Sequence, residues 1–435
     1  MVDVLVLGAT GYTGKLITRY LAVHRERGSF TFGLAGRSKS KLAQLVSDLN
    51  IPEIQTYTVD VTDDESLSSL LSSSRAKVLL STVGPYMRWG MPVARACARS
   101  GVHYVDIDGE APFVKDLIME VDYLATKTGS ILVPSSGFDS VPADLLVYLS
   151  AITMRKALNE VDATNSSEWE NVGITESHTM YSAKGGVSGG TLATVFLLLE
   201  SFPRKKLAKL MAPDVLSPIK LRTPSSPKLV YTFPGIRSGR YGHAWPLGPH
   251  NVAIVQRSHG LFHLQASAGI QDEEVERPAY AENFMYTESQ AASNQFVAFF
   301  AGLGLMLRAA CLVLFPPIRW LAKRLVIQPG QGPSDEVLQN GYVKMQNISV
   351  SSPLPGTNKS LIIESFARGR GDPGYALTAV MSAEVALGLL APREKLPAIA
   401  RSGGVLTPAT ALGSALLKRL SASGRFEFEN NVRED

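Results

Sequence analysis

Three glycines near the amino terminus constrain the fold of this chain more than any other feature. Gly8, Gly11 and Gly14 stand three residues apart, between an apolar run at Val2–Leu7 and a segment with helical spacing of apolar residues at Lys15–Leu21. A strand that turns this sharply into a helix needs residues without a Cβ atom. The pattern therefore predicts that the chain opens with a β-strand, a tight turn and an α-helix.

The alternation of strand and helix continues to about residue 158. The expected strands are Val2–Leu7, Phe30–Ala35, Ile54–Val59, Val78–Val83, Tyr104–Ile107 and Ile131–Pro134. Later helices are expected at Leu42–Leu49, Met91–Arg99, Phe113–Leu124 and Val141–Leu158. One more is expected to begin at a capping box formed by Thr62 and Glu65. Parallel neighbours need crossover connections, which helices supply. The order thus predicts an α/β fold with a Rossmann-type, doubly wound parallel sheet.

The pattern changes after about Asn159, where a polar stretch at Asp162–Glu168 indicates a linker. Four later runs lack regular intervening helices, and they predict a mixed sheet in a second, α+β domain: Ile174–Tyr181, Leu229–Phe233, Val343–Val350 and Leu361–Phe366. Late helices at Tyr375–Leu390 and Pro408–Leu420 are expected to pack back on the first domain. The expected division is therefore 1–158, 159–370 and a helical 371–435.

Composition excludes several classes of protein. With 45% hydrophobic and 19% charged residues, the chain is neither disordered nor a coiled coil. A formal net charge of +4 is too small to indicate nucleic-acid binding without a concentrated basic face. Cys97 and Cys311 cannot form a disulfide framework, and no secretory signal precedes the first strand, so an intracellular protein is expected. The seven histidines show no metal-binding pair, and no metal is expected.

The glycine turn is a candidate dinucleotide site. In a strand–turn–helix unit, amide groups at the start of the helix face the pyrophosphate, with the helix dipole behind them. A purely structural turn is the alternative, but this triplet opens a complete β-α-β unit, which favours cofactor binding. The expected contacts come from Gly8, Thr10, Gly11, Tyr12, Thr13 and Gly14.

The end of the second strand indicates which dinucleotide binds. NAD sites carry a carboxylate there for the ribose 2′-hydroxyl, whereas this chain has Arg37 and Ser38. A guanidinium can form a bidentate pair with a 2′-phosphate, and Ser38 can donate to it. NADPH is therefore the predicted cofactor, and a solvated surface arginine is the alternative interpretation of Arg37.

Further candidates follow the third, fourth and fifth strands. Asp60 is placed either to meet the adenine edge or to cap the next helix. Tyr86 and Asp108 are candidate proton donors near the nicotinamide, with core packing and helix capping as their respective alternatives. Asp139 is interpreted first as a helix-start residue. Three more cofactor contacts are expected after the fourth strand: Ser81, Thr82 and Gly84.

Several rarer blocks follow in order: Ser81–Tyr86, Tyr104–Asp106 with Gly109-Glu110, Ser136–Asp144, Gly185–Thr191, Gly371–Tyr375 and Gly403–Ala409. With the glycine turn, they resemble the saccharopine dehydrogenase-like oxidoreductases, most closely the branch of trans-acting enoyl reductases and lipid-droplet-associated homologues. The resemblance implies nicotinamide-dependent reduction of an acyl or lipid-like double bond, in a cleft between a Rossmann domain and a substrate domain. The alternatives are an imine or carbonyl reductase acting on an amino-acid-like metabolite, and a lipid-surface protein without turnover.

A membrane-facing segment is expected within 296–325. Phe296–Phe315 carries a single charge, Arg308, and is long enough to span a bilayer. A central arginine costs about 2.5 to 3.5 kcal/mol on insertion scales, so shallow binding is favoured over spanning. The Trp-and-basic segment 319–324 and the basic stretch 204–228 suit anionic headgroups of a membrane or lipid droplet. A buried or homodimer-forming helix is the alternative.

Overall fold

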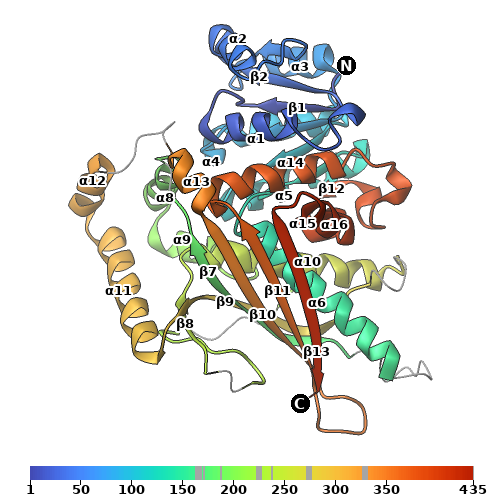
Figure 1. Cartoon of the computed structure of the whole chain (residues 1–435), viewed down its shortest axis with the longest axis vertical. Helices are drawn as coiled ribbons and strands as arrows, with labels where there is room; N and C mark the ends of the chain where they lie inside the picture. The colour runs from blue at the N-terminus through green and yellow to red at the C-terminus, as the bar shows by residue number, and fades with distance from the viewer. Residues whose placement is uncertain are drawn as a thin grey trace.

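The computed structural model describes residues 1–161, 169, 172–186, 189–221, 228–236, 239–270, 277–325 and 332–434. These residues build a parallel sheet at one end of the molecule and a mixed sheet with longer strands at the other, as Figure 1 shows. The expected linker Asp162–Glu168 lies outside the described residues.

The parallel sheet has seven strands in the order β12-β6-β5-β4-β1-β2-β3. Their bounds are β1 (Val4–Leu7), β2 (Phe32–Gly36), β3 (Gln55–Thr58), β4 (Val78–Ser81), β5 (His103–Asp106), β6 (Ile131–Val133) and β12 (Gly404–Val405). Every residue of β1, β2 and β4 is buried, as expected for a sheet covered by helices on both faces. The predicted doubly wound α/β fold is confirmed, and β12 adds a seventh strand from the carboxyl-terminal segment.

Six helices connect the first six strands and lead out of the sheet. They are α1 (Tyr12–Ala22), α2 (Lys39–Asp48), α3 (Asp64–Ser74), α4 (Tyr86–Ser100), α5 (Ala111–Thr128) and α6 (Ser140–Val161). Gly101 and Gly129 end α4 and α5 in the left-handed region, with φ of 70° and 77°. The predicted ends of these two helices are thus confirmed.

Two predicted helix starts are wrong. The cap of α3 is Asp63 instead of Thr62, and its carboxylate accepts from the amides of Glu65 at 3.3 Å and Ser66 at 3.0 Å. Helix α4 begins at Tyr86, five residues before the expected start. The reason is a cap from another strand connection, because the Glu110 carboxylate accepts from the amides of Tyr86 and Met87 at 2.9 and 2.8 Å.

The second sheet is mixed, with the order β13-β11-β10-β7-β9-β8. Its strands are β7 (Ile174–Lys184), β8 (Tyr241–Ala244), β9 (Tyr280–Ala292), β10 (Tyr342–Ser351), β11 (Leu361–Arg370) and β13 (Phe426–Glu434). Only the β7–β9 pair is parallel, which confirms the predicted mixed sheet. The expected strand Leu229–Phe233 is wrong, because Tyr231 forms a single isolated bridge with Gly242.

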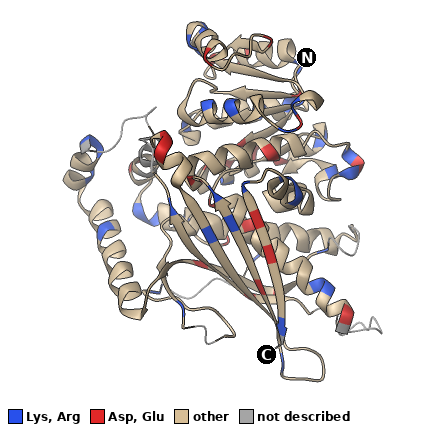
Figure 2. Cartoon of the chain, in the orientation of Figure 1, with Lys and Arg blue, Asp and Glu red and all other residues tan. Residues whose placement is uncertain are grey.

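The carboxyl-terminal segment was expected to be helical, but it contributes a strand to each sheet. Strand β13 is a polar edge strand, and its charges pair with those of its neighbour β11 through Arg368–Glu429, Arg370–Glu427 and Glu364–Arg433. Figure 2 shows acidic and basic positions on adjacent strands of this sheet. The expected helix Pro408–Leu420 is two helices, α15 (Pro408–Leu412) and α16 (Ser414–Ala422), separated at Gly413 with φ 48°.

The remaining helices surround the second sheet and the junction between the sheets. Helices α8 (Gly189–Ser201), α9 (Arg204–Leu210), α11 (Gln295–Leu314) and α12 (Pro316–Leu325) lie on one side of the molecule (Figure 1). Helix α10 (Gly248–Ser267) packs against α6 and β9, and α14 (Thr378–Gly388) against α1, β4 and β5. The short helix α13 (Asp335–Asn340) precedes β10.

Candidate active site

The glycine turn lies at the carboxyl edge of the parallel sheet. Gly8 has φ +81°, and a Cβ atom there would lie 2.7 Å from Thr82 Oγ1. A Cβ atom on Gly14 would lie 2.3 Å from the Gly8 carbonyl oxygen. No described side chain caps the start of α1 at Gly11, so the amides there are open to an anion. The cradle fits the pyrophosphate of a dinucleotide, and a side chain at Gly8 or Gly14 would fill or distort it.

The loop after β4 is tied directly to this turn. The Thr82 hydroxyl donates to the carbonyl oxygens of Leu7 and Gly8, both at 3.1 Å, and the Ser81 hydroxyl accepts from the Val83 amide at 3.4 Å. The structure therefore brings the expected contacts at Ser81 and Thr82 to the glycine turn. Their contact with a cofactor stays a prediction, as does that of Gly84.

The adenine end of the edge carries Arg37, Ser38 and Asp60. Arg37 is exposed just beyond β2, and the Ser38 hydroxyl caps α2 by accepting from the Lys41 amide. Asp60 accepts from the amide and the hydroxyl of Thr62 at 2.9 and 2.7 Å. These bonds lower the pKa of Asp60, and the charge of nearby Arg37 contributes. Asp60 therefore shapes the turn before α3, and its contact with adenine stays a prediction.

Segments from the second half of the chain cover the glycine turn. The Tyr12 hydroxyl donates to the carbonyl oxygen of Pro333, and its ring meets Tyr375 edge-on at 5.4 Å. The Gly186 amide donates to Asp372 at 2.6 Å, which joins two of the blocks shared with the related family. The cofactor edge is thus enclosed by residues distant in sequence, so Tyr12 has a role in closure in addition to its predicted contact.

Three acids gather at the carboxyl end of β5. Asp106, Asp108 and Glu110 are all buried. Asp106 accepts from the amides of Asp108 at 3.1 Å and Ser135 at 2.9 Å, and Asp108 accepts from the Glu110 amide at 2.8 Å. Burial raises the pKa of Asp108 well above its ordinary value, and the neighbouring Asp106 carboxylate adds to this. Asp108 thus uses one oxygen to close the turn that leads into α5, and its second oxygen is directed elsewhere.

Tyr86 makes contacts that favour core packing over catalysis. Its hydroxyl donates to the Ser81 carbonyl at 3.0 Å and accepts from the Ile107 amide at 3.4 Å. Its ring packs against Phe113, with 5.7 Å between the ring centroids. Because the hydroxyl joins the backbones of two loops, Asp108 is the stronger of the two candidate proton donors.

Two residues that were not predicted as site residues, Ser135 and His250, complete the surroundings of Asp108. Ser135 Oγ lies 2.8 Å from Asp108 Oδ2 and 3.0 Å from His250 Nε2. Ser135 follows β6 at the carboxyl edge, so its position in the strand order was an available signal. His250 lies in the first turn of α10, 115 residues after Ser135, and nothing in its local sequence indicated its contact with Ser135.

A second buried polar cluster lies at the junction of the two sheets. The hydroxyls of Tyr181 and Tyr286 donate to Glu288 Oε2, both at 3.0 Å, and the Asn251 amide group donates to Oε1 at 2.9 Å. Burial raises the pKa of Glu288 to about 8, so the neutral acid is favoured at neutral pH. Asn251 follows His250 in α10, and the two buried clusters therefore adjoin.

Asp139 immediately precedes α6, and its carbonyl oxygen accepts from the Ala143 amide at 3.2 Å, so the predicted helix-start position is confirmed. Its φ is +81°, and its carboxylate accepts from the Trp245 indole at 3.0 Å. The indole stacks on Tyr181 with 4.9 Å between ring centroids. Burial raises the pKa of Asp139 to about 7. Asp139 therefore links the first sheet to the second cluster.

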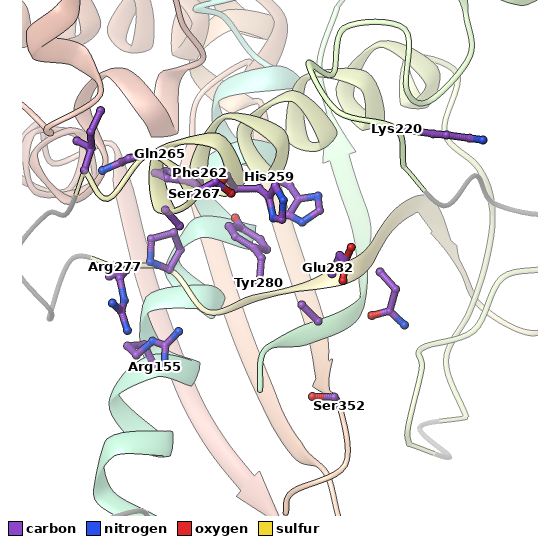
Figure 3. Close-up of a pocket in the computed structure, with 16 residues that line it drawn as sticks. Arg155, Lys220, His259, Phe262, Gln265, Ser267, Arg277, Tyr280, Glu282 and Ser352 are labelled. Carbon is purple, nitrogen blue, oxygen red and sulfur yellow. The ribbon is translucent and has the colours of Figure 1, made fainter. Parts of the chain in front are cut away.

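A cavity of about 920 Å³ lies away from this edge, between α6, α10 and the start of β9. Its lining includes Arg155, His259 and Tyr280 (Figure 3). Helix α6 begins at Ser140 beside the site, and Arg155 lies about four turns, or roughly 22 Å, further along it. The cavity is therefore separate from the carboxyl edge where the glycine cradle and the buried acids meet.

Known proteins share this architecture. Residues 4–133 match the saccharopine dehydrogenase NADP binding domain, which supports NADPH as the cofactor. A Mycobacterium tuberculosis protein, provisionally named a trans-acting enoyl reductase, is 34% identical over 97% of this chain and 96% of its own. The trans-acting enoyl reductase of Mycobacterium ulcerans is 30% identical with the same coverage. The saccharopine dehydrogenase (L-Glu forming) of Saccharomyces cerevisiae, 14% identical, matches all of both chains with a TM-score of 0.50 and shares the fold.

Proposed function

Because the chain belongs to the family of the trans-acting enoyl reductases, we propose that it reduces a carbon–carbon double bond of an acyl substrate with NADPH. The observation that carries the proposal is the glycine turn, which lies at the same sheet edge as the buried Asp108, whose pKa is raised by burial. NADPH supplies the hydride when it is bound. The protein must then bind and orient both partners and provide one proton.

The residues of the edge divide these tasks. The amides that begin α1 hold the pyrophosphate, and Arg37 at the end of β2 holds the 2′-phosphate. Asp108 supplies the proton that completes reduction, since burial favours its neutral form. Burial of this carboxyl group excludes bulk water from the reacting centre.

The test is NADPH oxidation, followed by absorbance, with enoyl thioesters, cyclic imines and aldehydes as acceptors. We expect turnover with enoyl thioesters alone. Turnover with imines or aldehydes instead would establish the amino-acid-like alternative. Tight NADPH binding with no turnover on any acceptor would indicate a lipid-surface protein that has lost catalysis.

We also propose that the enzyme works inside the cell at an anionic membrane or lipid-droplet surface, bound through α11 and α12. The most apolar 18 residues of α11 have a mean hydropathy of 2.2, and only 11% of them are buried. Small residues of α11 face the rest of the protein, since Ala298 is buried and a Cβ on Gly302 would lie 2.6 Å from the Leu229 carbonyl and 3.5 Å from His243 Cβ on β8. Its large apolar residues therefore remain outside: Phe296, Phe299, Phe300, Met306, Leu307 and Leu314.

Charge next to this face suits anionic headgroups. Helix α12 carries Arg319, Lys323 and Arg324 beside the exposed Trp320, and α9 adds three lysines and an arginine (Figure 2). An ion pair of 2.6 Å between Lys323 and Glu200 fastens α12 to α8. Aromatic residues beside basic ones are typical of helices that lie in a membrane interface. Residues 222–227 of the expected basic stretch lie outside the described residues.

Replacing Phe296 and Phe300 together by serine should weaken vesicle binding at least tenfold, because burial of each ring is worth roughly 1.5 to 3 kcal/mol. The measurement is flotation with vesicles of phosphatidylcholine and phosphatidylglycerol. The matched control replaces Met119 and Tyr123, which are 73% and 75% exposed on α5, by serine. Equal flotation of the two double variants would refute the docking surface, and a doubled mass without vesicles would point to a homodimer instead.

A further inference from the structure

One serine joins the two sides of the candidate active site. Ser135 follows β6, and its hydroxyl lies between the Asp108 carboxyl group and the His250 imidazole, at 2.8 and 3.0 Å. All three side chains are buried. The backbone of Ser135 is held at φ +56°, in the left-handed region that non-glycine residues rarely adopt, and its amide donates to Asp106. The strained backbone is thus fixed in the position that aims the hydroxyl at both neighbours.

The last nitrogen of this hydrogen-bonded series, His250 Nδ1, has a free hydrogen-bonding position within the described part of the chain. His250 Nδ1 is buried and has no partner among the residues that the structure describes. His250 lies in the first turn of α10, and its amide donates to the carbonyl of Leu247, a residue that is 38% exposed. A buried polar atom without a partner is costly, and such atoms are uncommon in native proteins. The group next to Nδ1 is therefore expected to be a ligand.

The direction of the hydrogen bonds follows from the protonation of Asp108. When Asp108 is ionised, the Ser135 hydroxyl donates to Oδ2 at 2.8 Å. In the neutral form, which burial favours, the carboxylic acid instead donates to the Ser135 oxygen, and the serine hydroxyl donates to His250 Nε2. With Nε2 as an acceptor, the hydrogen of the neutral imidazole is on Nδ1. Burial lowers the pKa of His250 to about 4, which excludes a resident imidazolium as the acid at neutral pH.

We propose that Asp108, Ser135 and His250 form a proton relay whose last donor, His250 Nδ1, protonates the α-carbon of the reduced acyl substrate. This inference rests on the proposed function, since it assigns the proton of that reaction. A neutral imidazole alone is a very weak acid. It can release the Nδ1 proton only if Nε2 gains a proton in the same step. Ser135 can donate that proton, and Asp108 can replace it on the serine oxygen.

The step balances in atoms and charge. Hydride addition at the β-carbon leaves an electron pair and a negative charge on the thioester enolate. The Nδ1–H bond breaks and a C–H bond forms at the α-carbon, while the Ser135 proton moves to Nε2 and the Asp108 proton to the Ser135 oxygen. The negative charge ends on Asp108. After product release one solvent proton at Nδ1 resets the relay in reverse.

The first test needs neither cofactor nor substrate. In cofactor-free protein labelled with ¹⁵N-histidine, the His250 resonances, identified by their loss in a His250→Gln variant, should show hydrogen on Nδ1. Ser135→Ala should remove that tautomer preference, while the isosteric Asp108→Asn should keep it because its amide still donates to Ser135. Hydrogen on Nε2 in the wild-type protein would overturn the relay, whatever reaction the enzyme catalyses.

The second test uses turnover with an enoyl thioester. Ser135→Ala and Asp108→Asn should each lower kcat by about 10²- to 10⁴-fold, the usual range for a general acid, with KM and NADPH affinity little changed. The matched control is Ser136→Ala, because the hydroxyl of this buried neighbour donates to the Val133 carbonyl, at 2.9 Å, and contacts neither Asp108 nor His250. Equal kcat in the Ser135 and Ser136 variants would refute the relay and leave the reductase function standing. Absence of turnover in the wild-type protein with a correct tautomer would instead refute the proposed substrate.

Discussion

A Gly14→Ala variant should bind NADPH about a hundredfold more weakly than the wild-type protein. The new Cβ would lie 2.3 Å from the Gly8 carbonyl oxygen and 2.9 Å from Ala9 Cα. Both neighbours are backbone atoms and cannot rotate away, so α1 must shift from the turn that follows β1. Overpacking of this kind costs about 1 to 3 kcal/mol, and 2.7 kcal/mol corresponds to a hundredfold in affinity. The measurement is titration of NADPH fluorescence.

The control for this variant is Gly28→Ala. Gly28 is exposed in the connection after α1, and a Cβ atom there would meet nothing within 4 Å. Thermal unfolding of both variants separates a local shift at the turn from general loss of structure. Gly14→Ala protein that remains folded and binds NADPH with wild-type affinity would show that the turn does not hold the pyrophosphate.

An Arg37→Asp variant should lose about a hundredfold in NADPH affinity and gain affinity for NADH. Hydrogen bonds to a charged group contribute about 1.5 to 3 kcal/mol, and the substitution also places a carboxylate opposite the 2′-phosphate. Asp60, which is close enough to Arg37 for its pKa to be lowered by it, adds to the repulsion. The same carboxylate at position 37 can accept from the 2′-hydroxyl of NADH, as in NAD-specific sites. Parallel titrations with both nucleotides measure the change.

The control for this variant is Arg99→Asp, which makes the same change of charge at a site away from the predicted cofactor contacts. Arg99 is exposed near the end of α4, away from the carboxyl edge of the sheet. Its affinities for both nucleotides should match those of the wild-type protein. If Arg37→Asp and Arg99→Asp bind NADPH equally well, Arg37 is the solvated surface arginine that the sequence left as an alternative.

Much of the first domain was predictable because its signals are local. Apolar periodicity marked β1 and the strands that follow it, and Gly101 and Gly129 marked helix ends. The prediction of a strand at Leu229–Phe233 was wrong, because an apolar run shows that residues prefer burial but does not show that a partner strand lies beside them. Strand β13 was missed for the converse reason, since its charges are stabilised by those of β11 and its own sequence is polar.

Local residue patterns were enough to specify the doubly wound order and the glycine turn, because strand and helix periods and the need for a missing Cβ act within a few residues. Which groups face each other inside the site depends instead on segments that are distant in sequence. Glu110 caps α4 from a neighbouring strand connection, and Ser135 meets His250 across 115 residues of chain. Such contacts depend on how whole sheets and helices pack. A local pattern of residues does not indicate which distant side chain will lie beside it after packing.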